Sequence, residues 1–163
     1  MRQICETKRP SRGGEVSTMH IWGTGVFDNA PAVEWADQFD RTAAVGRPAL
    51  VRSALATAVR AGDQRAWLVA LGAATTVAAA LPGGLLLAEN TGPKSVTDNQ
   101  FQPSIELAAV ALATLEQCIS VHTEWTRLWT RAALLDDAIA VVEAVIEELE
   151  ERTALTVRVR EAS

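Results

Sequence analysis

The chain has 163 residues, of which 48% are hydrophobic, and its formal net charge is −5 at neutral pH. This predicts one domain with an apolar core, because a domain of about 150 residues buries about 70% of its extended surface. The acids are spread along the chain, and no lysine and arginine stripe is interleaved with aromatics, which argues against nucleic-acid partners.

The leader at residues 1–18 has scattered charge and no hydrophobic period, so we expect it to be disordered. The run GGEV at residues 13–16 can be encoded by codons that contain a purine-rich ribosome-binding sequence, and Met19 follows closely. We therefore expect Met19 to be the native start. N-terminal sequencing of protein made from the native gene should find Met19 first, and a mature chain that retains Met1 or Arg2 would contradict this.

The run IWGTGVFDNAP at residues 21–31 sets two large aromatics among glycines. We expect Gly23 and Gly25 to supply turns, and Trp22 and Phe27 to pack onto the helices as a plug. The run would then be an irregular structural segment at the beginning of the domain.

A first helix is expected after this segment, with Asp28 or Asn29 as its N-cap and Pro31 in its first turn. Glu34 and Asp37 lie on one face near its positive end, where acids are favourable. The apolar face of this helix is formed by Ala32, Trp35, Ala36 and Phe39.

A second helix is expected to end at Gly62, and a third to run from a cap at Asp63 to Leu81. The third helix is apolar nearly all round and rich in small residues, which is typical of a central helix packed on several sides. Because Pro82 ends it, it is too short to cross a bilayer. The second helix has Leu50, Ala54, Leu55 and Ala58 on one side.

Residues 85–103 carry turn residues and no period, so we expect a long surface loop that is either a binding element or a plain connector. Two helical series follow, capped by Ser104 and Thr123, and together predict an antiparallel helical hairpin. Residues 154–163 are expected to be a flexible tail, either a short strand or a fraying helix. The two series are Ile105, Ala108, Leu112, Leu115, Ile119 and His122, then Trp125, Leu128, Ala132, Leu135, Ile139, Val142, Ile146 and Leu149.

The sequence thus predicts an all-α bundle of about five helices over residues 19–153, with an irregular N-terminal Trp/Gly segment. From Met19 to about Thr153 it resembles the bacterial family called domain of unknown function 4259. The resemblance rests on the signature Trp22, Gly23, Gly25, Phe27, Asp28 and Asn29, on RPALVRSALATAV, VAAALPGG and GPK further along, and on EWTRLW at residues 124–129. It implies a helical fold and no particular activity. The family's acidic residue after the Asn is replaced here by Ala30.

Few residues suggest catalysis, metal binding or a cofactor. The two cysteines, Cys5 and Cys118, lie in segments of different character, and Cys118 is expected to be a small buried hydrophobe. His20 and His122 are the two histidines, and no metal-binding or nucleophile motif includes them. We therefore expect no cofactor and no metal, and a reducing cytoplasmic location in the absence of a signal-peptide pattern.

Two functional hypotheses remain open. The first is a non-catalytic protein-interaction module with an immunity, antitoxin-like or accessory role. Trp22, Trp125 and Trp129 are then partly exposed anchors, whereas the alternative is that all five tryptophans lie in the core. The second is an enzyme or ligand-binding protein with a polar site around Asp28 and Asn29 at the N-terminus of the first helix. A protein partner is expected under the first hypothesis, no membrane partner is expected, and a homodimer is compatible with either.

Overall fold

The structure is a computed structural model that describes residues 20–83, 92–98, 100–120 and 122–163. The predictions for the leader, for Met19 and for residues 85–91 lie outside the described residues. The all-α fold is confirmed, with more helices than the five expected. The described elements are α1 (Ala30–Arg41), the 3-10 turn η1 (Ala44–Gly46), α2 (Arg47–Ala61), α3 (Gln64–Ala80), α4 (Lys94–Thr97), α5 (Ile105–Cys118), α6 (Glu124–Arg131) and α7 (Leu135–Glu161).

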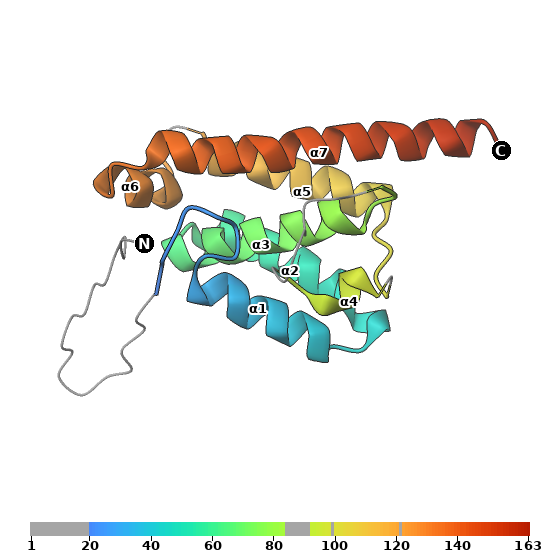
Figure 1. The fold of residues 1–163 in the computed structure, drawn as a ribbon, viewed down its shortest axis with the longest axis horizontal. Helices are drawn as coiled ribbons and strands as arrows, with labels where there is room; N and C mark the ends of the chain where they lie inside the picture. Colours follow the sequence, from blue (N-terminus) through green and yellow to red (C-terminus); the bar gives the residue numbers. More distant parts are fainter. Residues whose placement is uncertain (1–19, 84–91, 99, 121) are drawn as a thin grey trace.

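Helix α3 lies at the centre of the arrangement, with α1 on one side and α5 and α7 on the other, and α2 packs against both α3 and α5 (Figure 1). It also contacts α4 and α6, and 12 of its 17 residues are buried. The hydroxyls of Thr75 and Thr76 donate to the carbonyls of Leu71 and Gly72 at 2.8 Å, so these polar groups are satisfied inside the helix. The predicted central helix is therefore confirmed.

The predicted ends of α1, α2 and α3 are also confirmed. Asn29 is the N-cap of α1, and its side chain accepts a hydrogen bond from the backbone N–H of Ala32. Gly62 ends α2 in the left-handed conformation, with a φ of 67° that favours glycine. Asp63 caps α3 by accepting from the N–H of Ala66 at 2.8 Å.

The described part of the predicted 85–103 loop is more ordered than expected, because Asp40 binds it. The short helix α4 lies here, and the Asp40 carboxylate accepts from the N–H groups of Lys94 and Ser95 at 3.0 and 2.9 Å. The Ser95 hydroxyl also donates to Asp40, at 2.7 Å. These bonds join the C-terminal end of α1 to the start of α4.

Arg47, the first residue of α2, binds both the end of α1 and the segment that follows α4. Its guanidinium donates to the backbone carbonyls of Phe39, Asp40 and Gln100 at 3.2, 3.4 and 3.0 Å, although only 5% of the residue is exposed. It also lies 5.3 Å from the centre of the Phe39 ring, which packs edge-on against buried Phe101. A loop with a buried aromatic is anchored to the core, which no hydrophobic period in the sequence indicated.

The C-terminal hairpin differs in detail from the prediction. Helices α5 and α7 pack against each other and run in opposite directions, but the expected second helix is split by a break after Arg131 (Figure 1). At this break Ala133 has a φ of 58°, and the N–H of Leu134 bonds to the carbonyl of Trp129 at 3.0 Å. Because of this break, α6 is a separate short helix that lies between α5 and α7 in the sequence.

Helix α7 continues to Glu161, so the alternative of a strand in the C-terminal tail is wrong. Its final turns extend beyond the other helices in Figure 1. Cys118, at the end of α5, is 1% exposed, as expected of a small buried hydrophobe, and burial raises the pKa of its thiol. Within the described ranges, no helix is long and apolar enough to cross a membrane.

The bonds to Asp40 predict a pH-dependent contribution to stability. Partial burial acts to raise the pKa of Asp40, but the hydrogen bonds from Ser95 and Lys94 and the charge of Arg47 outweigh it, so the pKa lies below its usual value of 3.8. A lowered pKa contributes stability above pH 3.8 that is lost as the pH falls through the folded-state pKa. Asp40→Ala should therefore melt below the wild type at pH 7, and the difference should shrink below pH 3.8.

Thermal unfolding followed by circular dichroism from pH 7 down to pH 3 measures this difference. Asp37→Ala removes an exposed carboxylate from the same helix and is the matched control. It should cost less at pH 7, because no described group donates to that carboxylate. A melting difference for Asp40→Ala that is constant across the pH range would contradict the prediction.

Candidate functional site

The signature segment, residues 20–29, forms a closed loop ahead of α1. The N–H of Trp22 donates to the carbonyl of Asp28 at 2.9 Å, and the N–H of Ala30 donates to the carbonyl of His20 at 2.8 Å. Ile21 and Asn29 thereby form an antiparallel bridge. The loop is tightened by a further bond from the N–H of Asp28 to the carbonyl of Gly25, at 3.0 Å. Its two ends are therefore held together by backbone bonds alone.

The two signature glycines leave room for the Asp28 carboxylate, which lies inside the loop. Its Oδ2 atom accepts from the N–H of Gly25 at 3.1 Å. A Cβ added at Gly23 or at Gly25 would lie 2.9 Å from Cγ of Asp28, closer than side-chain atoms normally approach. The spacing Gly-x-Gly-x-x-Asp thus builds a cradle for a carboxylate of the chain itself.

Asn29 uses both ends of its amide within the segment. Its Oδ1 accepts from the N–H of Ala32 at 2.9 Å, and its Nδ2 donates to the carbonyl of Val26 at 3.1 Å. Only 1% of the residue is exposed. Asn29, rather than Asp28, is the cap of α1, and the amide that was expected to receive a ligand is engaged inside the protein.

The predicted plug is formed by a different pair of residues. Phe27 is buried as expected, with its ring 3.4 Å from the place of a Cβ at Gly72, so it packs where α3 has no side chain. Trp22, however, is 41% exposed, and its neighbour Ile21 is buried instead. The prediction that Trp22 packs onto the bundle is therefore wrong. Alternation along the extended residues explains this, because successive side chains point to opposite faces.

Under the interaction hypothesis Trp125 and Trp129 would be partly exposed anchors, and the structure contradicts this in favour of the alternative that they are core residues. They are 1% and 2% exposed, and their rings pack edge to face with centres 6.4 Å apart. Both lie on the inner face of α6, which contacts α3 and α7. Their indole nitrogens have no hydrogen-bond partner among the described residues. These two tryptophans are core residues, and they do not form a surface site with Trp22.

The other candidate groups remain apart. Glu34 pairs with Arg65 of α3 at 2.7 Å, where both side chains are largely exposed, so it does not join Asp37 in a cation site. In the part of the chain that the structure covers, no group of three or more His, Cys, Asp or Glu residues could hold a metal ion. His122 is exposed between α5 and α6, in the left-handed conformation with a φ of 74°.

A cavity of about 540 Å³ between the turn that follows α5, helix α6 and the first turns of α7 was not anticipated from the sequence. Its lining combines apolar side chains with three basic ones, from Ile119, Ser120, His122, Thr126, Arg127, Thr130, Arg131, Leu135 and Ile139. It exists because the chain breaks between α6 and α7, and the expected continuous helix would not have formed it. The i, i+4 spacing of Arg127 and Arg131 was the signal in the sequence for a basic face.

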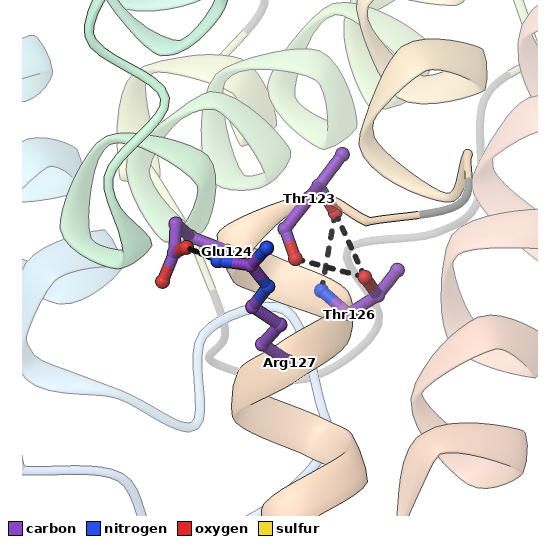
Figure 2. A network of polar contacts seen from close by, with 4 residues as sticks. All are labelled: Thr123, Glu124, Thr126 and Arg127. Carbon is purple, nitrogen blue, oxygen red and sulfur yellow. Dashed lines mark hydrogen bonds and ion pairs between the residues drawn. The ribbon is translucent and has the colours of Figure 1, made fainter.

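The start of α6, at one wall of this cavity, is held by local polar contacts (Figure 2). The Thr123 hydroxyl accepts from the N–H of Thr126 at 3.1 Å and donates to the carbonyl of Cys118 at 2.8 Å, which ties α6 to the end of α5. Glu124 and Arg127 form an ion pair on the other side of the helix in this view. The predicted cap at Thr123 is confirmed, and α6 is a positioned element although it is short.

The carboxylate cradle predicts a coupling between Gly23 and Asp28. Gly23→Ala should destabilise the protein by about 1–3 kcal/mol, as overpacking of a filled site usually does. In an Asp28→Ala background the carboxylate is absent, so the methyl added at position 23 meets only the Cβ of residue 28 and its cost should be smaller. Chemical denaturation of the wild type, both single variants and the double variant measures the coupling. Additive costs would show that the carboxylate does not determine the need for glycine.

Comparison with known proteins shows which family the chain belongs to. The family model described as Domain of unknown function (DUF4259) matches residues 21–141, which begins inside the signature segment and ends in α7. No curated protein and no solved structure matches the chain. The match covers most of the sequence, including the glycine cradle, the Asn29 cap, the central helix and the cavity-forming break. The chain belongs to the family of domain of unknown function 4259.

Proposed function

We propose that this protein is a non-catalytic protein-interaction module and that it contacts its partner through the signature segment. The observation that carries the proposal is the exposure of Trp22, whose side chain is 41% accessible at the edge of a closed loop. Tryptophan is among the residues that most often dominate the binding energy of protein interfaces.

The rigidity of the segment supports this role. The backbone bonds of Trp22 and Ala30 and the cradle around Asp28 hold the loop in one conformation. A side chain presented on a rigid support loses little conformational entropy on binding, so more of its contact energy contributes to affinity. The loop also packs on α3 through Phe27, which joins the presented tryptophan to the core.

A second surface feature lies close to Trp22 in the sequence. Val33, in the first turns of α1, is 37% exposed, and its N–H bonds to the carbonyl of Asn29 at 3.2 Å. Val33 thus adds an exposed apolar side chain on α1, the helix whose N-cap is Asn29 of the signature segment. An immunity, antitoxin-like or accessory role would use such a surface to bind one protein partner.

The alternative of a polar ligand site around Asp28 and Asn29 has less support. A ligand that approached the N-terminus of α1 would have to displace the Asn29 side chain from the N–H of Ala32. It would also have to compete with the N–H of Gly25 for the Asp28 carboxylate. Breaking buried hydrogen bonds of this kind costs about 1–3 kcal/mol for each unsatisfied group.

The proposal predicts that Trp22 contributes to binding and not to stability. Trp22→Ala should change the free energy of unfolding by about 0.5 kcal/mol or less, because it truncates an exposed side chain. In affinity capture from native lysate with tagged protein, the partner retained by the wild type should be lost with Trp22→Ala. Val45→Ala, at a position that is 92% exposed on η1, is the matched control and should retain it.

Two outcomes would contradict the proposal. A large drop in melting temperature for Trp22→Ala would give the side chain a structural role. Equal recovery of the partner with both variants would move the binding surface away from the signature segment.

A further inference from the structure

The cavity between the turn that follows α5, helix α6 and the first turns of α7 is suited to a ligand that joins an apolar chain to one negative charge. We propose that it binds a small amphiphilic carboxylate, of the size and type of a medium-chain fatty acid anion. This site is independent of the surface proposed above and shares no residue with the signature segment.

The floor of the cavity is apolar and is formed by residues of α7 and of the turn that follows α5. Ile119 follows α5, and Leu135 and Ile139 lie on the first turns of α7. All three are partly buried, although they pack against the main core. Their accessible faces give an alkyl chain a surface to cover, and covering apolar surface is favourable in water.

The threonines of α6 strengthen the apolar character of the wall. The hydroxyl of Thr126 donates to the carbonyl of Thr123 at 2.8 Å, and that of Thr130 donates to the carbonyl of Thr126 at 2.7 Å. Their hydroxyl protons are therefore already used within the helix (Figure 2 shows the first of these bonds).

The cavity presents the positive charge of Arg131, in a chain that is acidic overall. The lining contains His122, Arg127 and Arg131 and no carboxylate, although the whole chain carries −5. Arg127 is already paired with Glu124. Arg131 is exposed and takes part in none of the three ion pairs formed among the described residues. Arg131 is thus the cation available to an incoming anion.

The backbone at the cavity has an unusual conformation. The residues on either side of α6, His122 and Ala133, are the only described residues other than glycine with positive φ, at 74° and 58°. Such conformations are costly without glycine, and they concentrate at binding sites, where the surrounding structure maintains them. Here the two residues lie in the connections that flank α6, and His122 itself lines the cavity.

The size and chemistry of the cavity together indicate the ligand class. A volume of about 540 Å³ is within the range of about 300–1,000 Å³ that is common for small-molecule sites. The carboxylate would pair with the Arg131 guanidinium, which matches a planar carboxylate in a two-pronged geometry. The alkyl chain would lie along Ile119, Leu135 and Ile139.

The test compares three probes of equal chain length: octanoate, octan-1-ol and octylammonium. Titration of the isotope-labelled full chain, followed by backbone amide shifts, gives the affinity and the location of each probe. We expect octanoate to shift amides around residues 130–139 and to bind up to about fivefold tighter than octan-1-ol, the ratio for an ion pair with an exposed arginine. Octylammonium should bind more weakly than either, and raised salt should reduce the advantage of octanoate.

Matched variants test whether Arg131 binds the carboxylate and whether Ile139 contacts the alkyl chain. Arg131→Gln should remove the advantage of octanoate over octan-1-ol, whereas Arg52→Gln, at an exposed position on α2, should leave it unchanged. Ile139→Ala should weaken both probes alike. Amide spectra with the dispersion of the wild type will show that the variants are folded, because Ile139→Ala removes a side chain that packs against the core and should lower the melting temperature. Arg131→Lys should restore part of the octanoate advantage, because it keeps the positive charge.

Three results would overturn the proposal. Octanoate could bind no tighter than octan-1-ol, its advantage could survive in Arg131→Gln, or the shifted amides could lie away from α5, α6 and α7. None of these outcomes depends on the partner of Trp22, so failure here and failure of the interaction proposal are distinguishable.

Discussion

Small side chains on α3 let the neighbouring helices approach it closely, and the arrangement of the other elements follows from that approach. Ala32 of α1 lies 3.4 Å from the position of a Cβ at Gly72, and the Phe27 ring lies at the same distance. Because α3 is buried on nearly all sides, it must be covered by several elements at once. The signature segment is one of these covers. Its structure is therefore linked to the core, even though Trp22 faces solvent.

The regions around α3 are fastened by polar groups that belong to no regular helix pattern. Arg47 binds three backbone carbonyls, Asp40 binds two backbone N–H groups, and together they hold Lys94, Ser95 and Gln100 against α1 and α2. A buried guanidinium is costly unless its donors are satisfied, and here carbonyls satisfy them. In the same way, Asp28 and Asn29 are satisfied by the segment that they organise. The polar residues at the two ends of α1, Asp28, Asn29 and Asp40, thus have structural roles.

The two proposed binding surfaces differ in their physical origin. Trp22 is presented because an extended segment alternates its side chains, so that burial of Ile21 requires exposure of its neighbour. The cavity arises from a break in a helical series that contains neither glycine nor proline. Ala133 adopts a left-handed conformation at that break, where the N–H of Leu134 bonds to the carbonyl of buried Trp129. One surface is local in origin, and the other depends on packing at a distance.

The sequence by itself determined the helical class, the caps at Asp63, Ser104 and Thr123, the stop at Gly62 and the buried character of α3, and it narrowed the cap of α1 to Asp28 or Asn29. These features depend on residues close together in the chain, such as a polar side chain that meets an N–H three residues later. Tertiary structure decided the exposure of Trp22, the burial of Trp125 and Trp129, the anchoring of Phe101 and the break after Arg131. Each of these depends on which surfaces meet across the fold, because a tryptophan is stable either buried or exposed and a helix can be interrupted when packing offsets the cost. Local hydrogen bonding can be inferred from neighbouring residues, but the competition among helices for the faces of α3 cannot.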